Sequence, residues 1–327
     1  MQIVIPDDYQ DVVDRLACFS LIRHHQVTRY REPARDLDQL AGRLHDAEVV
    51  VSIRERVEFS RALLERLPKL RLIALVGRNS QAIDFAACTE LGIAVAAGKS
   101  NSPVAPAELT LALILAARRN VAREAERMRR GEWPCTLSHR LRGSALGIFG
   151  LGAIGELVAQ GGHGLGMQVL VFGQESSLKK AAAAGYARAA SKDELFERSD
   201  VLSLNVRLTR ETRGIVGPAD LARMKPTALL VNTARAELIA PGALVAALRQ
   251  GRPGYAAVDV YEQEPITGGE HPLLAMPNVL CTPHLGWAEW DNFELYFREA
   301  FEQIVAYERG LPLRLRNPEV RMRGERA

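Results

Sequence analysis

The chain has 327 residues, a length typical of about two domains, and its 47% hydrophobic and 25% charged residues are ordinary for a globular protein. The formal net charge is only +3, and several of the arginines lie in the segment 314–327. The sequence lacks the basic stripe that is typical of nucleic-acid-binding elements, so we expect this segment to be a solvated tail.

The cysteines, the start of the chain and the apolar runs indicate the cellular compartment that we expect for the protein. The four cysteines are scattered without the pairs typical of metal or redox sites, so we expect unpaired thiols in a reducing cytosol and no metal. The start of the chain has no basic segment or cleavage-like site. The longest apolar run, Leu109–Ala117, is too short to span a bilayer. These features favour a cytoplasmic protein.

Short apolar runs alternate with segments of helical periodicity over roughly the first 95 residues. The expected strands are Gln2–Ile5, Glu48–Ile53, Leu70–Leu75 and Ile93–Ala96. The expected helices between them are Leu37–His45, Ser60–Leu67 and Ile83–Leu91. This alternation predicts a parallel sheet with both faces covered.

A second series of strands and helices begins near Ala145. Its expected strands are Ala145–Phe149, Gln168–Phe172, Val201–Asn205, Ala228–Asn232, Ala256–Val260 and Val279–Thr282. Its expected helices are Ile154–Leu165, Ser177–Ala184, Lys192–Glu197 and Pro241–Gln250. Six strands in this order predict a second doubly wound sheet.

Two long helical stretches flank the second series. Pro103–Arg130 precedes it, with Ser102 as the expected N-cap, and Trp287–Arg309 follows it and ends before Gly310. The final segment is too short for a domain, so we expect it to pack back on the first sheet. The predicted domains are therefore 1–101 with 288–327, and 102–287.

A glycine-rich turn follows the first strand of the second series. Gly150, Gly152 and Gly155 stand in the pattern GxGxxG, with Ala153 and Ile154 opening the next helix. The strand before, the helix after and a second strand ending about 20 residues later favour a dinucleotide-binding loop. The glycines permit close approach to a pyrophosphate, and the helix N-terminus attracts that anion.

The next strand ends without the acidic residue that usually binds the adenosine ribose. Gly173 occupies that position and Gln174 follows it. The change removes a ribose ligand and also the repulsion against a 2′-phosphate. Glu175 can reach the ribose from a shifted loop, whereas Gln174 and its polar neighbours can bind a phosphate. The choice between NAD and NADP stays open.

Three polar residues follow three later strands, where open α/β sheets bind ligands. They are Arg235 in Asn232-Thr233-Ala234-Arg235, Glu264 in Asp259-Val260-Tyr261-Glu262-Gln263-Glu264, and His284 in Thr282-Pro283-His284-Leu285-Gly286. Taken singly, each has an ordinary structural explanation. Together, downstream of a dinucleotide loop and in this order, they favour a functional site over three separate structural roles.

These motifs, in this order, resemble those of the D-isomer-specific 2-hydroxyacid dehydrogenases, which include glyoxylate and hydroxypyruvate reductases and phosphoglycerate dehydrogenases. The resemblance covers nearly the whole chain. It implies a Rossmann cofactor domain, a flavodoxin-like substrate domain and an active-site cleft between them. It also implies hydride transfer between a nicotinamide cofactor and a 2-oxo or 2-hydroxy acid.

The resemblance assigns a role to each residue of the trio. His284 would exchange the proton of the substrate oxygen, Glu264 would hold the imidazole, and Arg235 would bind the substrate carboxylate. Residues expected near the cofactor are Gly150, Gly152, Ala153, Ile154, Gly155, Gly173, Gln174, Asn205, Val206, Arg207, Thr212, Thr233, Ala234, Asp259 and Gly286. Asp259 would contact the carboxamide, although hydrogen bonds to the backbone at the strand end are the alternative.

The resemblance also places substrate contacts in the first sheet. The segment Val76-Gly77-Arg78-Asn79-Ser80 matches the family's carboxylate-binding loop, with Asn79 where a glycine is usual. Arg54 follows an earlier strand in a similar position. If Arg54 or Arg78 faces the substrate, a second anionic group on the substrate is plausible.

Several alternatives stay open at this point. A non-catalytic nucleotide-sensing protein of the corepressor type is one, although the intact trio counts against it. A non-carbon hydride donor such as phosphite is another. The resemblance also implies a homodimer, with Pro103–Arg130 and the following Trp133 and Pro134 as the expected contact arm.

Overall fold

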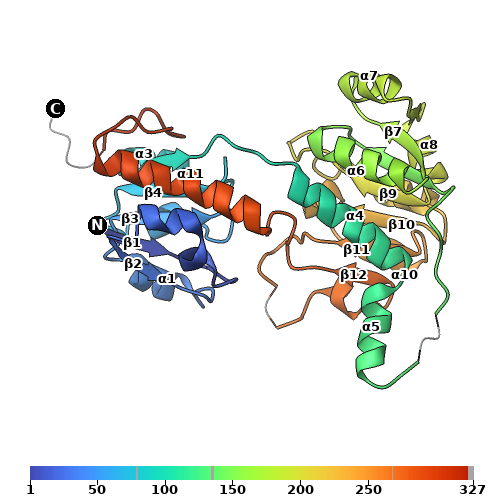
Figure 1. Ribbon diagram of the computed structural model, residues 1–327, viewed down its shortest axis with the longest axis horizontal. Coiled ribbons are helices and arrows are strands. Elements are labelled where there is room, and N and C mark those ends of the chain that lie inside the picture. The colour runs from blue at the N-terminus through green and yellow to red at the C-terminus, as the bar shows by residue number, and fades with distance from the viewer. Residues whose placement is uncertain (79, 134–135, 267, 323–327) are drawn as a thin grey trace. The chain divides into compact units, whose positions relative to one another are not determined.

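The structure, a computed structural model, describes residues 1–78, 80–133, 136–266 and 268–322. The chain divides into two compact units, Met1–Ser102 with Trp290–Ala327, and Pro103–Glu289 (Figure 1). Each unit contains one parallel sheet, so the expected fold class of two parallel α/β sheets is confirmed. Within the described ranges, no helix is both long enough and apolar enough to cross a membrane.

The first unit has a five-stranded sheet in the order β2-β1-β3-β4-β5, the flavodoxin-like order. Its strands are β1 Gln2–Ile5, β2 Gln26–Arg29, β3 Val49–Ile53, β4 Leu72–Val76 and β5 Ala94–Ala97. All neighbouring strands are parallel. The central strands β3 and β4 are buried along their whole length, as expected where helices cover both faces.

Helices from both parts of the first unit cover its sheet. They are α1 Leu37–Leu44, α2 Arg61–Leu64, α3 Phe85–Glu90 and α11 Trp290–Glu308, with the 3₁₀ helices η1 Val13–Arg15 and η2 Ala17–Leu21. The side chains of Asp36 and Asp84 accept backbone N–H groups at the starts of α1 and α3. The long α11 packs on β4, β5 and η2, which ties the C-terminal segment to this unit.

The second unit has a seven-stranded parallel sheet in the order β12-β11-β10-β9-β6-β7-β8. Its strands are β6 Ala145–Phe149, β7 Gln168–Phe172, β8 Ala187–Arg188, β9 Val201–Leu204, β10 Leu229–Asn232, β11 Tyr255–Val258 and β12 Val279–Cys281. The first strand, β6, pairs with both β7 and β9, so the strand order reverses beside it. Ligands bind at such a switch point in doubly wound sheets.

Helices cover both faces of this second sheet (Figure 1). The helices of this unit are α4 Val104–Arg118, α5 Val121–Arg129, α6 Ala153–Gly164, α7 Glu175–Ala183, α8 Lys192–Arg198, α9 Pro218–Arg223 and α10 Ala243–Arg249, with the 3₁₀ helices η3 Ala236–Leu238 and η4 Pro272–Ala275. Helix α5 follows α4 and contains no buried residue. Helices α4 and α6 pack on one side, whereas α8, α9 and α10 contribute to the core on the other.

The structure corrects several expected elements. The stretch Pro103–Arg130 is two helices, because Asn120 adopts a left-handed conformation with φ 55° and ends the first of them. The N-cap of α4 is Pro103 rather than Ser102. The last helix begins at Trp290, three residues later than expected. The strands β2 and β8 and the helix α9 were not predicted.

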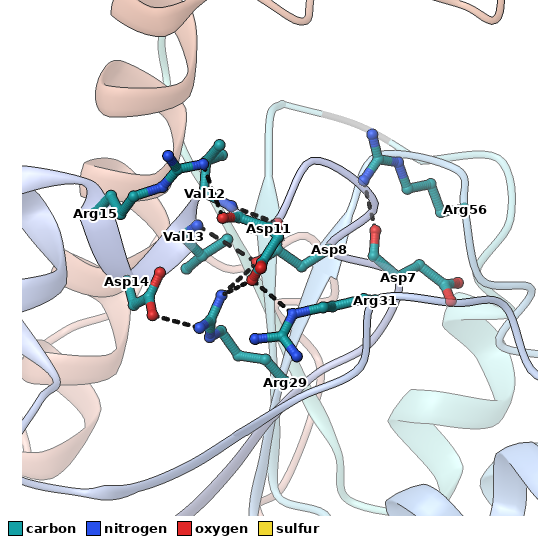
Figure 2. A network of polar contacts seen from close by, with 10 residues as sticks. All are labelled: Asp7, Asp8, Asp11, Val12, Val13, Asp14, Arg15, Arg29, Arg31 and Arg56. Atoms are coloured by element: carbon teal, nitrogen blue, oxygen red, sulfur yellow. Dashed lines mark hydrogen bonds and ion pairs between the residues drawn. The ribbon is translucent and has the colours of Figure 1, made fainter.

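A network of carboxylates and arginines fixes the chain after β1 (Figure 2). Arg29, at the end of β2, donates to Asp8 at 2.9 Å and to Asp11 at 3.0 Å, and it also pairs with Asp14. Arg31 pairs with Asp11 at 2.7 Å. Asp8 is fully buried, and its carboxylate also accepts the backbone N–H groups of Val12 and Val13, each at 3.4 Å. The network therefore holds the segment that follows β1 against the edge strand β2.

Asp7, next to this network, is buried without such compensation. The residue is 4% exposed, and among the described residues Oδ1 has no hydrogen-bond partner. Arg56 donates to the backbone oxygen of Asp7 at 2.5 Å and stacks 4.4 Å above the ring of Tyr9. Burial raises the pKa of Asp7 to about 6, and the charges of Arg56 and Arg43 oppose the shift only partly. Ionised Asp7 therefore destabilises the folded state.

The substitution Asp7→Asn is expected to stabilise the protein at neutral and alkaline pH. The pKa of Asp7 is higher in the folded state than its usual 3.8, so the folded form loses stability as the pH rises from about 4 to above 6. The neutral amide avoids this loss, and asparagine tolerates the φ of 61° at this position. We expect a gain on the order of 2 kcal/mol at about pH 8, vanishing near pH 4, by urea unfolding.

The exposed Asp38 offers a matched control, because it pairs with Arg66 at the surface. Asp38→Asn should change the free energy of unfolding by less than about 0.5 kcal/mol at either pH. An Asp7→Asn variant that is no more stable than the parent at high pH would contradict the buried-charge argument.

Candidate active site

The sheet of the second unit brings the predicted trio to one edge. Arg235 lies just after β10, Glu264 lies after β11, and His284 lies after β12. These three strands are neighbours and parallel, so their carboxyl ends lie side by side. Residues separated by about fifty positions in the sequence are therefore brought together by strand order alone.

Glu264 and His284 form the central contact of this edge. Oε2 of Glu264 lies 2.5 Å from Nδ1 of His284, and Oε1 accepts the backbone N–H of Tyr261 at 2.9 Å. Burial raises the pKa of Glu264, but the hydrogen bond and charge of His284 and the N–H of Tyr261 lower it, as does the charge of Arg235. The balance holds the pKa of Glu264 below its usual value. Glu264 is therefore an ionised acceptor that orients the imidazole.

The hydrogen bond to Glu264 leaves the other ring nitrogen of His284 for chemistry. Within the described part of the chain, Nε2 of His284 makes no hydrogen bond. The side chain is 26% exposed, so this nitrogen belongs to a partly accessible group. His284 also has φ 50°, a left-handed conformation that is uncommon for a residue with a side chain. An imidazole held in this way can give or take a proton.

Arg235 is held by the turn that follows β10. The buried side chain of Asn232 donates to the carbonyl oxygen of Arg235 at 2.9 Å and accepts the N–H of Ala234 at 3.1 Å. Nη1 of Arg235 donates to the carbonyl of Ala234 at 2.7 Å. The arginine lies close enough to Glu264 to lower its pKa. The trio thus combines a fixed cation, a carboxylate and an imidazole.

Asp259, expected near the cofactor, holds the segment that carries His284. The carboxylate is fully buried, and Oδ1 accepts Thr282 Oγ1 at 2.6 Å and the N–H of Leu285 at 2.7 Å. Oδ2 accepts the N–H of Gly286 at 2.8 Å. Burial raises the pKa of Asp259, and these three hydrogen bonds and the charge of His284 oppose the rise. The hydrogen bonds from the N–H groups of Leu285 and Gly286 are the backbone contacts that the sequence analysis gave as the alternative role of Asp259.

The glycine loop has the geometry needed to hold a pyrophosphate. Gly150 has φ 93°, and a Cβ atom on Gly155 would lie 2.3 Å from the carbonyl oxygen of Gly150. A Cβ on Gly152 would meet nothing within 4 Å, so the outer side of the turn is open. No side chain caps α6, which begins at Ala153, so its first N–H groups, including that of Ile154, are available to an anion. The loop therefore fits a dinucleotide.

At the end of β7, one of the polar residues near Gln174 is buried and is therefore not exposed to a ligand. A Cβ atom on Gly173 would lie 3.1 Å from Oγ of Ser177, and that hydroxyl accepts the N–H of Leu151 at 3.1 Å. Ser177 is buried and stabilises the glycine loop, so it is not an exposed phosphate ligand. Gln174 is the N-cap of α7 and makes no capping hydrogen bond through its side chain, as far as the described residues show.

The other residues expected near the cofactor lie on the same unit. The carbonyl of Asn205 and the side chain of Val206 contact the glycine loop, each within 3.2 Å of a Cβ placed on Gly150. Thr212 donates to the carbonyl of the exposed Arg207 at 2.7 Å, and so closes the turn after β9. Thr233 shares a hydrogen bond of 2.7 Å with Thr110 of α4.

The substrate candidates lie at the carboxyl edge of the first unit's sheet. Arg54 follows β3 with φ 54°, and its guanidinium lies against Gly77, which follows β4. Arg78 is exposed, whereas Ser80 is buried and its hydroxyl accepts the N–H of Ala82 at 3.1 Å. Asn79 lies outside the described residues. Arg54 and the loop at Gly77 therefore form one continuous edge.

Sequence reasoning missed two sets of residues that shape these edges. Asp7, Tyr9 and Arg56 follow β1 and β3 of the first unit, but they match no motif. The side chain of Asn232 positions Arg235, and the hydroxyl of Ser177 positions Leu151 in the glycine loop; no sequence motif identifies these supporting roles. The position of Asp7 and Arg56 shortly after two strands is the sequence signal that could have identified the first set.

Comparison with known proteins agrees with this geometry. Residues 111–286 match the model of the family "D-isomer specific 2-hydroxyacid dehydrogenase, NAD binding domain". The glyoxylate reductase of Aeropyrum pernix is 38% identical over 270 residues, covering 79% of each chain. The D-3-phosphoglycerate dehydrogenase of Methanocaldococcus jannaschii is 37% identical over 251 residues, which cover 76% of this chain and 47% of that protein.

A solved structure extends the likeness over the whole chain. The phosphoglycerate oxidoreductase of Vibrio cholerae o395 superposes with a TM-score of 0.90 at 46% identity, covering 95% of this chain and 99% of that one. The chain therefore belongs to the D-isomer-specific 2-hydroxyacid dehydrogenase family, and it is an oxidoreductase that transfers a hydride between a nicotinamide cofactor and a small 2-oxo or 2-hydroxy acid.

Proposed function

We propose that His284 is the acid–base residue of this reaction, that Glu264 positions it, and that Arg235 binds the substrate carboxylate. The observation that carries the assignment is the 2.5 Å contact between Glu264 Oε2 and His284 Nδ1 at the strand ends that also hold Arg235. With Nδ1 occupied, Nε2 of His284 exchanges the proton of the substrate oxygen. The planar fork of Arg235 suits a carboxylate better than the point charge of lysine does.

The cofactor supplies or accepts the hydride, and the protein's own groups handle charge and protons. In reduction, negative charge develops on the carbonyl oxygen, so a proton from His284 and the charge of Arg235 stabilise it. Glu264 stays ionised, because its pKa lies below the usual value, and its contact with Nδ1 orients the imidazole for proton transfer through Nε2. In oxidation, neutral His284 accepts the hydroxyl proton.

The first unit is proposed to supply the remaining substrate contacts. Arg54 and Arg78 add positive charge at the carboxyl edge of the first sheet, where the guanidinium of Arg54 lies against Gly77 and the hydroxyl of Ser80 accepts the N–H of Ala82. Relatives include proteins named glyoxylate reductase, glycerate dehydrogenase and (S)-sulfolactate dehydrogenase. We propose small 2-oxo acids as substrates, with a preference for those that carry a second anionic group.

A panel of small 2-oxo acids, with and without a second acidic group, tests the substrate and the roles. We expect loss of reduced-cofactor absorbance with the parent enzyme. In His284→Ala, kcat should fall by about 10²–10⁴-fold while cofactor affinity is unchanged, because only the proton transfer is lost. His271→Ala is the matched control, since His271 pairs with Glu262 at 3.1 Å outside the trio.

The control variant should keep kcat within a few-fold of the parent. Unchanged turnover in His284→Ala would contradict the assigned role. Equal kcat/KM for acids with and without a second acidic group would contradict the proposed preference, without bearing on His284.

For the cofactor, we propose that NAD and NADP are both accepted without strong preference. Gly173 supplies neither a ribose ligand nor a charge that repels a 2′-phosphate. The nearby cations are already engaged, because Lys179 pairs with Glu175 at 3.8 Å and Lys180 pairs with Glu156 at 3.0 Å. In the described part of the chain, this strand end therefore provides neither an acidic residue that selects NAD nor an unpaired lysine that selects the 2′-phosphate of NADP.

The two cofactors should have KM values within about tenfold of each other in the parent enzyme. Gly173→Asp should raise the KM for NADPH by at least about tenfold relative to Gly173→Ala, because a carboxylate repels the 2′-phosphate. The alanine variant carries the same Cβ contact with Ser177, so the difference isolates the charge. A strong NADH preference in the parent enzyme would contradict the proposal.

We also propose a homodimer formed through α4, α5 and the segment that follows. In this region Val121, Met128, Trp133 and Leu137 are 54–96% exposed, although they are large and apolar. None of the nine residues of α5, all of them described, is buried. Several large apolar side chains exposed in one region of the chain are typical of a protein interface. The free thiols of Cys18, Cys88 and Cys281 support a reducing cytoplasm as the compartment.

Sedimentation equilibrium should show a dimer at micromolar concentration. A Trp133→Ser, Leu137→Ser double variant should shift the equilibrium toward monomer, because it removes apolar area from the interface. Leu311→Ser, which alters an exposed leucine of the first unit, should leave the dimer intact. A monomeric parent protein would contradict the proposal.

A further inference from the structure

Two adjacent histidines meet the end of the last helix in the first unit. His24 and His25 lie in the turn between η2 and β2, and Glu308 is the last residue of α11. Oε1 of Glu308 lies 3.5 Å from Nε2 of His24 and 3.7 Å from Nε2 of His25. One potential ligand atom from each of the three side chains lies within 4.8 Å of the other two.

The buried histidine has an unsatisfied ring nitrogen. The side chain of His25 is only 5% exposed, and among the described residues Nε2 has no hydrogen-bond partner. Buried polar side-chain atoms are paired in the large majority of cases. Nε2 of His25 faces the carboxylate of Glu308 at 3.7 Å, beyond hydrogen-bond distance, so an ion held between these two atoms would contact both.

The end of α11 attracts positive charge. The C-terminus of a helix carries a partial negative charge, which lysine, arginine or histidine in the last turn usually offsets. The 19-residue α11 has no basic residue in its last turn and ends on the carboxylate of Glu308. The carboxylate of Glu308 therefore stands at the negative end of the helix dipole, beside the two imidazoles.

We propose that His24, His25 and Glu308 form a binding site for a divalent transition-metal ion, with Zn²⁺ as the best match. Two imidazoles and one carboxylate suit zinc, whereas magnesium and calcium prefer sites made of oxygen atoms. Zinc bonds of about 2.0 Å in tetrahedral geometry place ligand atoms about 3.3 Å apart. The separations of 3.5 and 3.7 Å between Glu308 and the two histidines need only small side-chain movements, and the two histidine ligand atoms lie within 4.8 Å of each other.

The exposure of the ligands allows an ion to enter. The side chain of His24 is 54% exposed and that of Glu308 is 39% exposed, so the ion reaches Nε2 of His25 from their side. A water molecule completes the coordination. The bound ion joins the turn before β2 to the end of α11, two segments far apart in the sequence. Its role is to stabilise the first unit, and it does not depend on the proposed catalytic residues.

Zinc titration of the untagged, chelator-treated full-length protein tests this site by calorimetry. The protein must lack a polyhistidine tag, and an N-terminal extension is also avoided because the Met1 nitrogen lies 3.4 Å from Nδ1 of His25. We expect one zinc ion per chain and a higher Tm with zinc than without it. His24→Ala and Glu308→Gln should each weaken zinc binding by at least about tenfold.

His45→Ala is the matched control, because His45 is an exposed histidine beside a single carboxylate, Asp46. It should leave both the zinc affinity and the zinc-dependent rise in Tm unchanged. Magnesium should bind in none of these proteins. The proposal is overturned if the parent protein does not bind zinc, or if His24→Ala and Glu308→Gln bind it as tightly as the parent. Neither readout requires turnover, so failure here is distinct from failure of the catalytic assignment.

Discussion

The buried carboxylate of Asp259 is the interaction on which the geometry of the candidate active site depends. It lies at the end of β11 and accepts three hydrogen bonds from the segment 282–286 that follows β12. Burial raises its pKa, so without those donors the charge would be costly in this position. The carboxylate and the segment therefore hold each other in place. His284 lies in the middle of that segment, so Asp259 fixes the backbone on both sides of it, and Glu264 holds its imidazole.

Strand order explains why the trio was predictable, whereas its support was predictable only in part: backbone hydrogen bonds of Asp259 were an open alternative, and the role of Asn232 was not foreseen. Each member lies in the segment that follows a strand, and parallel strands place their carboxyl ends along one edge, so the sequence predicts that Arg235, Glu264 and His284 lie together. The supports depend on contacts across that edge. Asn232 closes the turn that carries Arg235, and Asp259 closes the one that carries His284. Such contacts need the register of neighbouring strands, which a sequence pattern does not contain.

The elements that sequence analysis missed share a weak local signal. The strand β2, Gln26–Arg29, alternates polar and apolar residues at a sheet edge, and it is too exposed to form an apolar run. The strand β8 has only two residues. The break between α4 and α5 rests on the conformation of one residue, Asn120, within a stretch of good helix formers. The contact of His25 with Glu308 lies beyond any local pattern, because it joins opposite ends of the chain.

Backbone strain marks the same sheet edges in both units. Among the described residues, five other than glycine have positive φ, and three of them follow strands: Asp7 after β1, Arg54 after β3 and His284 after β12. Conformations of this kind are unfavourable by about 1–3 kcal/mol, and they persist where surrounding contacts enforce them. For Asp7, the cost of burying a carboxylate adds to the strain. A sheet that only had to fold would gain by relaxing these positions. Their concentration at the carboxyl ends of the strands, where α/β sheets bind ligands, is therefore a physical argument that both edges are shaped for binding, independent of any motif.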